Sequence, residues 1–182
     1  RDNITVNNFS GYTGAQGVFL GEGKLNNGQI DGRVRMVRLP LAQFLPLVGQ
    51  TGSGDLSGEF KIKGTSANLN VTGPFSLENG EIRGAKISEA HGFAGWENKI
   101  LTMRKVEVNM EQGRHTLDGT VNMQGAEPVI DCTAQTDDVR IEPLWQFGNF
   151  SFPVTGNLSN TVNVAGPLSN LNVVGNVHAW DG

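Results

Sequence analysis

Apolar and polar residues alternate with a period of two along most of this chain. Successive side chains of a β-strand point to opposite sides, so each such segment has one apolar and one polar face. Turn signals such as Asn27-Gly28, Gly73-Pro74 and Gly166-Pro167 separate the alternating segments. The pattern predicts an all-β chain whose strands are about six to ten residues long.

Three segments depart from this alternation. Residues 39–48 place apolar side chains at helical spacing between prolines, and residues 141–147 resemble them. Proline suits the first turn of a helix and disrupts its interior, so we expect one or two short helical turns that cover an edge or an open end of the sheet. Residues 89–97, which include Trp96, are predicted to form a loop or wide turn.

The chain contains one segment twice. Residues 54–80 return as residues 156–182, and because 156 minus 54 is 102, the offset is 102 residues. This offset holds without a gap, and the four glycines Gly54, Gly64, Gly73 and Gly80 all recur. Repetition at a fixed spacing is typical of elongated architectures in which each unit buries its apolar face against its neighbours.

The repeat divides the chain into three parts of one continuous β structure. Residues 1–16 are expected to end a preceding repeat, residues 17–118 to form a first module and residues 119–182 an incomplete second one. We therefore expect a portion of a longer protein. A sheet with one apolar face must bury that face, either by closing on itself, by stacking on a second sheet or by folding lengthwise into an open trough. The repeat favours the open, growing form.

Composition excludes several classes of protein. The 25 glycines have no every-third-residue period, which excludes collagen. The net charge is −4. Arg33, Arg35 and Arg38 form the densest basic group, but no aromatic residues lie among them, so a solvated face is favoured over a nucleic-acid site. Cys132 is the single cysteine, and no run of about twenty apolar residues suggests a membrane span.

Candidate chemistry is sparse. His91, His115 and His178 lack metal-ligand spacing, and no nucleophile or phosphate-binding motif occurs. Asp137 and Asp138 are adjacent, but no second acid stands at a partnering position. The sequence therefore predicts no enzyme activity, no metal site and no cofactor.

The repeat itself resembles a known family. Gly156-Asn157-Leu158-Ser159, Gly166-Pro167-Leu168-Ser169-Asn170 and Val173-x-Gly175-x-Val177-x-x-x-x-Gly182 are similar to the repeats of TamB-type translocation and assembly module proteins, in the AsmA-like superfamily. The family commonly has proline after the asparagine, whereas Leu69 and Leu171 stand there in this chain.

This resemblance implies a long sheet folded into a taco-like trough with an apolar interior. Such proteins are anchored in the inner membrane by an amino-terminal segment, cross the periplasm of a diderm bacterium and meet an outer-membrane barrel protein. The implied function is to shield phospholipid acyl chains during transport between the two membranes, with a role in outer-membrane biogenesis. An exposed apolar patch of this length also favours self-association.

On this interpretation the working residues are apolar side chains that line the groove. The expected lining residues are Phe60, Ile62, Leu69, Val71, Phe75, Leu77, Val162, Val164, Leu171, Val173 and Val177. The alternative is that these residues fill the interior of a closed β-sandwich or β-helix. Two other functions stay open: a scaffold or chaperone for outer-membrane protein assembly that binds a barrel partner by strand addition, and a surface β-helix adhesin.

Overall fold

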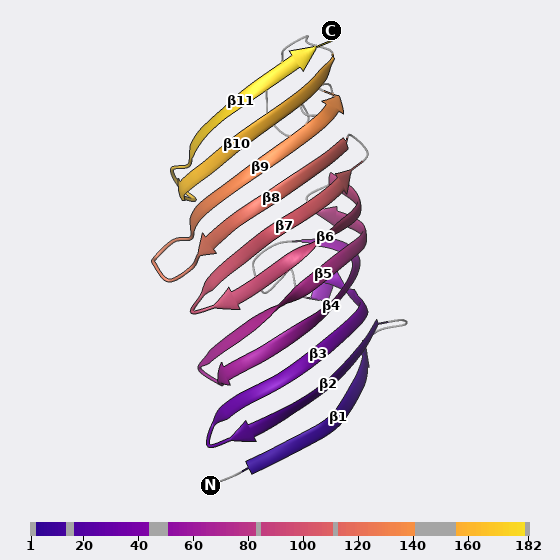
Figure 1. The fold of residues 1–182 in the computed structure, drawn as a ribbon. Coiled ribbons are helices and arrows are strands. Elements are labelled where there is room, and N and C mark those ends of the chain that lie inside the picture. Colours follow the sequence, from indigo (N-terminus) through magenta and orange to yellow (C-terminus); the bar gives the residue numbers. More distant parts are fainter. Residues whose placement is uncertain are drawn as a thin grey trace.

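The computed structural model describes residues 3–13, 17–43, 51–82, 85–110, 113–140 and 156–180. Within these residues the chain is a single eleven-stranded sheet, in which each strand pairs antiparallel with the next one in sequence. The strands are β1 (Asn3–Thr13), β2 (Gly17–Asn26), β3 (Gln29–Pro40), β4 (Gly52–Thr65), β5 (Asn68–Ile82), β6 (Ala85–Glu97), β7 (Ile100–Met110), β8 (Gly113–Asn122), β9 (Val129–Arg140), β10 (Asn157–Pro167) and β11 (Asn172–Trp180). Figure 1 shows them stacked like rungs from the N-terminus to the C-terminus.

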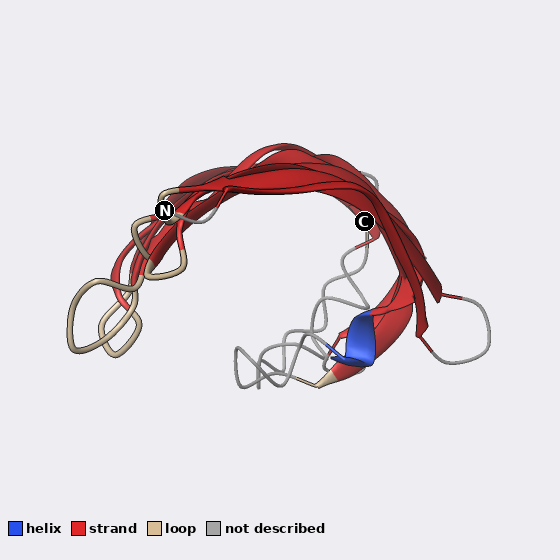
Figure 2. Cartoon of the chain, turned by 90° about the horizontal axis from the view of Figure 1, so that it is seen from below, coloured by secondary structure: helices blue, strands red, loops and turns tan. Residues whose placement is uncertain are grey.

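The predicted fold class is confirmed. β1 and β11 are opposite edges and do not pair with each other, so the sheet is open. Seen along the stack, it curls into an arch (Figure 2). One 3-10 turn, η1 (Leu41–Gln43), falls inside the first expected helical segment. The second expected segment, residues 141–147, lies outside the described residues.

The expectation of a loop at residues 89–97 is wrong, because these residues belong to β6. Ala90, Gly92 and Ala94 face the same way as Trp96 but are too small to give a strong alternating signal. They nevertheless pair in register with the strands on both sides, since Ala94 lies opposite Gly73 of β5 and Met103 of β7.

β-Bulges account for the curvature. A bulge places one extra residue in a strand relative to the strand it pairs with. Six of the described strands contain such an extra residue, namely β1, β3, β5, β6, β7 and β9. An extra residue bends its strand and increases the local twist. Arg38, Asn79 and Lys105 adopt left-handed backbone angles at three of these places, with φ values of 52°, 51° and 48°.

The facing strand supplies a hydrogen-bond acceptor at two bulges. The backbone N–H of Arg38 donates to Ser57 Oγ at 3.0 Å, and that of Lys105 donates to Asp118 Oδ1 at 2.9 Å. A bulge takes its residue out of the ladder and leaves its N–H group without a backbone acceptor. These two side chains therefore stabilise the bends that curl the sheet.

The two copies of the repeated segment adopt matching backbones. Gly54 and Gly156, 102 residues apart, have φ values of 133° and 130°, and Gly64 and Gly166 have 121° and 122°. An added Cβ at Gly64 would collide with the carbonyl oxygen of Asn68, at the end of the β4–β5 hairpin. The recurrence of glycine thus has a local geometric cause in both hairpins.

Candidate functional site

One face of the sheet is mostly apolar across all eleven strands. In register, Leu39 lies opposite Leu56, Leu56 opposite Leu77, and Leu77 opposite Ala90. A second row runs across the C-terminal half, from Leu117 through Ala134 to Val162. Side chains directly opposite one another in an antiparallel pair share a face, so both rows lie on the same side of the sheet.

This apolar face is the concave one. Among the described residues, the buried apolar side chains all lie on it, and they are Leu39, Phe60, Leu77, Ala90, Val106, Val139 and Leu158. Side chains on the inner side of a curled sheet converge, whereas those on the outer side spread apart. The two least exposed members, Val139 and Leu39, each lie directly after a bulge, in β9 and in β3. Val139 is 0% exposed and Leu39 2%.

The convex face carries most of the charged side chains and is solvated. Along β4, Glu59, Lys61 and Lys63 are exposed and alternate with Phe60 and Ile62. The Lys63 ammonium lies 4.0 Å from the carboxylate of Asp31, and both side chains are more than 60% exposed. Exposed ion pairs of this kind contribute little to the stability of the fold, so this face is a solvated exterior.

A hollow at β1–β3 illustrates the difference between the faces. Gly23 and Gly32 face each other across β2 and β3 and have no side chains to fill the inner surface. An inner hollow of about 230 Å³ results, and its apolar lining residues are Ile4, Val6, Phe9, Leu25, Ile30, Val34 and Ile62. An apolar cavity of about 150 Å³ accepts benzene, so this hollow has room for a hydrocarbon segment.

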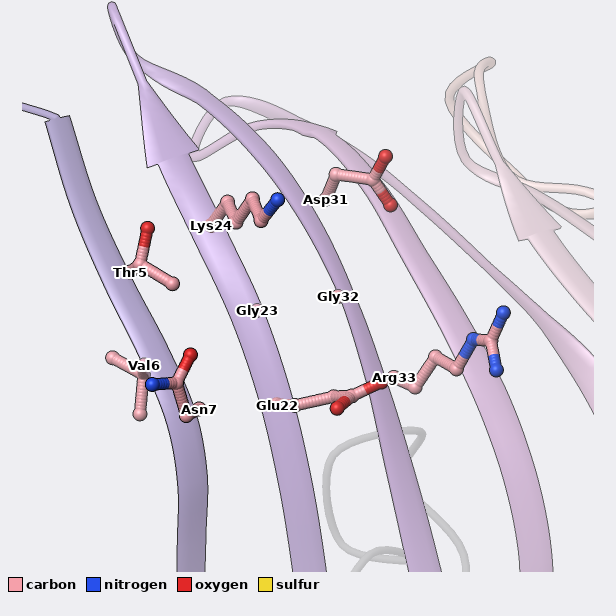
Figure 3. Close-up of a pocket in the computed structure, with 9 residues that line it drawn as sticks. All are labelled: Thr5, Val6, Asn7, Glu22, Gly23, Lys24, Asp31, Gly32 and Arg33. Carbon is pink, nitrogen blue, oxygen red and sulfur yellow. The ribbon is translucent and has the colours of Figure 1, made fainter.

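On the other side of the same glycines the surroundings are charged. Figure 3 shows Lys24 and Asp31 next to Gly23 and Gly32, with Glu22 and Arg33 further along the same two strands. Lys24 lies opposite Asp31, and Glu22 lies opposite Arg33. Because cations and anions alternate, this outer hollow has no net preference for a charged ligand.

The structure places ten of the eleven expected lining residues on the apolar face. Phe60 and Leu77 are buried there, and Val71, Val162 and Val164 are half-buried. Val173 and Val177 also lie on this face but are 60% and 65% exposed, because β11 is an edge strand. The remaining members on this face are Ile62, Leu69 and Phe75. Leu171 is 37% exposed and lies in the connection before β11, outside any strand.

Several residues that line the trough were not among those expected from the sequence. They come from the strands outside the repeated hairpins, and they include Phe9, Phe19, Val34, Trp96, Met103 and Val121. Val34 and Met36 carry the alternating signal, since they alternate with Arg33 and Arg35. The sequence expectation also did not include His115 and Thr136, whose side chains are joined by a hydrogen bond of 3.0 Å on the apolar face.

The described residues contain few groups suited to metal binding or to reaction with electrophiles. No group of three His, Cys, Asp or Glu side chains in this part of the chain could hold a metal ion. Cys132 faces the trough, where burial raises the pKa of its thiol. None of the helices that the structure describes is long and apolar enough to span a membrane.

Comparison with known proteins adds no relative, because no family model, curated protein or solved structure matches this chain.

Proposed function

We propose that this chain is a periplasmic segment of an elongated protein that shields phospholipid acyl chains while they move between the inner and outer membranes of a diderm bacterium. The observation that carries the proposal is the concave apolar face, which runs across the strands with a charged convex face behind it. No second sheet covers it in the described residues. The repeat, which resembles those of TamB-type proteins, supports the proposal from sequence.

The dimensions suit a lipid. Ten inter-strand spacings of about 4.8 Å give a trough of about 48 Å across the eleven strands. A bilayer with its headgroups is about 40–45 Å thick, so one lipid extends about half of that. Two lipids could therefore lie end to end on the trough of this segment.

The energetics suit transport rather than storage. Each methylene that leaves water is stabilised by about 0.8 kcal/mol, so an acyl chain is favoured on the apolar surface over water. The lining consists largely of similar aliphatic side chains on strand after strand. A chain that slides by one strand exchanges equivalent contacts, which keeps the barrier to movement low.

A second function is favoured by one observation. The edge strands expose apolar side chains, including Val173 at 60% and Val174 at 59% on β11. An edge strand can accept a strand from another protein, as a scaffold for outer-membrane protein assembly would. The adhesin alternative required a β-helix, whereas the described strands form an antiparallel meander.

Binding of a fluorescent acyl probe by the purified chain tests the proposal. Val164→Asp places a charge on the concave face of β10, and an unpaired charge on an apolar surface costs several kcal/mol. We expect the affinity for the probe to fall by at least about tenfold.

The matched control is Asn163→Asp on the same strand. Asn163 is exposed on the convex face, where its Oδ1 accepts a hydrogen bond of 2.8 Å from Thr133 Oγ1, and aspartate retains that acceptor. The control is expected to bind the probe like the unaltered chain. Equal loss of affinity in both variants, or no loss in either, would contradict a concave binding surface.

A further inference from the structure

The apolar trough contains one row of polar side chains. His115 of β8 lies opposite Thr136 of β9, and Thr136 lies opposite Asn160 of β10. Directly opposite residues are about 5 Å apart, so the row extends about 10 Å across three strands. Apolar residues border it on every side, namely Val108, Leu117, Ala134, Val139, Leu158, Val162 and Val177.

The row has unused hydrogen-bonding capacity. Thr136 is 8% exposed, and its hydroxyl is bonded to His115 Nδ1 at 3.0 Å. The half-buried Asn160 amide has no partner among the described residues, and neither does the second ring nitrogen of His115. An amide offers two donors and one acceptor, and a neutral imidazole offers one donor and one acceptor. The register places all three side chains on the concave face of the sheet.

The fold does not require these polar groups. At the repeat offset of 102 residues, Asn160 corresponds to Gly58. Gly58 lies opposite Met36 of β3, and Met36 lies opposite Phe19 of β2, so Met36 and Phe19 take the places of Thr136 and His115 on the apolar face of the first copy. The equivalent strands therefore form with no polar side chain at these places. Polar groups in an apolar surrounding cost free energy unless they are hydrogen-bonded, which leaves their presence in the second copy without a structural reason.

We propose that His115, Thr136 and Asn160 bind the ester carbonyl groups of a glycerolipid whose acyl chains lie on the neighbouring apolar rows. This inference rests on the proposed function and names the lipid group that the row recognises. An ester carbonyl is an uncharged acceptor attached directly to an acyl chain. It therefore meets the row where the apolar surface begins.

The chemistry of the row favours an ester over a phosphate. Phosphate is typically held by Arg or Lys, and none of the residues that border the row on this face is cationic. Arg114, next in sequence to His115, is exposed and pairs with Glu107. Burial also lowers the pKa of His115, which keeps the ring neutral at neutral pH.

The experiment compares two short-chain phosphatidylcholines that differ only in linkage, one diacyl and one dialkyl. The ether-linked lipid has the same headgroup and chain length but no carbonyl acceptors. Each displaces a fluorescent acyl probe from the purified full chain. We expect the diacyl lipid to bind about two- to tenfold more tightly, the range that corresponds to a net hydrogen bond.

Asn160→Leu is expected to reduce this ratio to about one while the affinity for the dialkyl lipid is kept or increased. Thr136→Val, a substitution of similar shape, provides a second variant should the first fail to fold. The control is Asn176→Leu, because Asn176 is exposed on the opposite face of β11 and should leave the ratio unchanged.

The outcomes separate the two proposals. Equal binding of the diacyl and dialkyl lipids by the unaltered chain would overturn the ester site and leave acyl-chain shielding intact. A preference that survives Asn160→Leu and Thr136→Val would overturn it as well. Failure of both lipids to displace the probe would count against the proposed function itself.

Discussion

Replacing Gly73 by alanine is expected to destabilise the sheet, because backbone atoms occupy the space that a side chain would need. Gly73 lies on β5 beside Phe60 of β4, and an ideal Cβ built there collides with the carbonyl oxygen of Glu59. The Glu59 carbonyl carbon and the Phe60 Cα would each lie 2.9 Å away. Real Cβ contacts are longer, and backbone atoms of a paired strand cannot rotate aside, so β4 and β5 must separate. Overpacking of this kind costs about 1–3 kcal/mol.

Gly95→Ala is the matched control. Gly95 also lies inside a strand, but the nearest atoms to its ideal Cβ are Thr72 Cγ2 at 3.5 Å and Thr102 Cβ at 3.8 Å, which are ordinary contacts. Alanine there is expected to stabilise by about 0.4–1 kcal/mol, since it restricts the unfolded chain. The two variants should thus differ by about 1.5–4 kcal/mol in free energy of unfolding.

Urea unfolding followed by circular dichroism measures this difference. With a dependence of about 2 kcal/mol per molar urea, the two midpoints should lie about 0.7–2 M apart, with Gly73→Ala lower. Gly175→Ala tests the equivalent place in the second copy, where an ideal Cβ lies 3.0 Å from the Val162 Cα. Coincident midpoints for Gly73→Ala and Gly95→Ala would refute the close approach of β4 and β5.

Three further predictions follow from single side chains. In the same urea assay, Lys105→Gly should stabilise the chain by about 1 kcal/mol, because glycine adopts the left-handed backbone of the β7 bulge without strain. Asp118→Ala should destabilise it by about 1 kcal/mol, because the Lys105 N–H loses its acceptor. A destabilising Lys105→Gly together with a stabilising Asp118→Ala would contradict the bulge geometry. Burial lowers the pKa of His115 from its ordinary value of 6.5. The contribution of the neutral ring to stability is therefore present above about pH 6.5 and is lost as pH falls through the lowered pKa of the folded state. Melting temperatures measured against pH should show this loss, and the same loss in a His115→Gln variant would exclude His115 as its cause. Burial raises the pKa of the Cys132 thiol, so its alkylation by iodoacetamide at pH 8 should be slower than the alkylation of free cysteine. The rate should fall further when an acyl ligand occupies the trough. An unchanged rate with bound ligand would contradict the inward position of Cys132.

The strands and the inward side chains of the repeated hairpins were predictable because alternation and burial agree there. Phe60 and Ile62 alternate with lysines in the sequence. In the structure these two residues share one face of the sheet and the lysines lie on the other. β6 was missed because its inward residues Ala90, Gly92 and Ala94 carry almost no hydrophobic signal. Its strand character comes from pairing with β5 and β7, which a single sequence does not display.

The β7 bulge leaves a trace in the sequence. Leu101 and Met103 alternate in one phase, while Val106, Val108 and Met110 alternate in the other. A change of phase inside one strand requires an extra residue if all five side chains are to share a face. The polar row could not be predicted, because His115, Thr136 and Asn160 are far apart in sequence and only the register across β8, β9 and β10 brings them together.

Site-specific photo-crosslinking in living cells tests the central proposal most directly, with the probe at Val164 on the concave face and at Asn163 on the convex face of β10. Adjacent positions on one strand share expression, folding and surroundings, so only the direction of the side chain differs. Acyl-chain shielding predicts phospholipid adducts at Val164 and none at Asn163. Protein adducts in place of lipid at Val164, or no lipid at Val164 despite full incorporation of the probe, would contradict a trough that carries acyl chains.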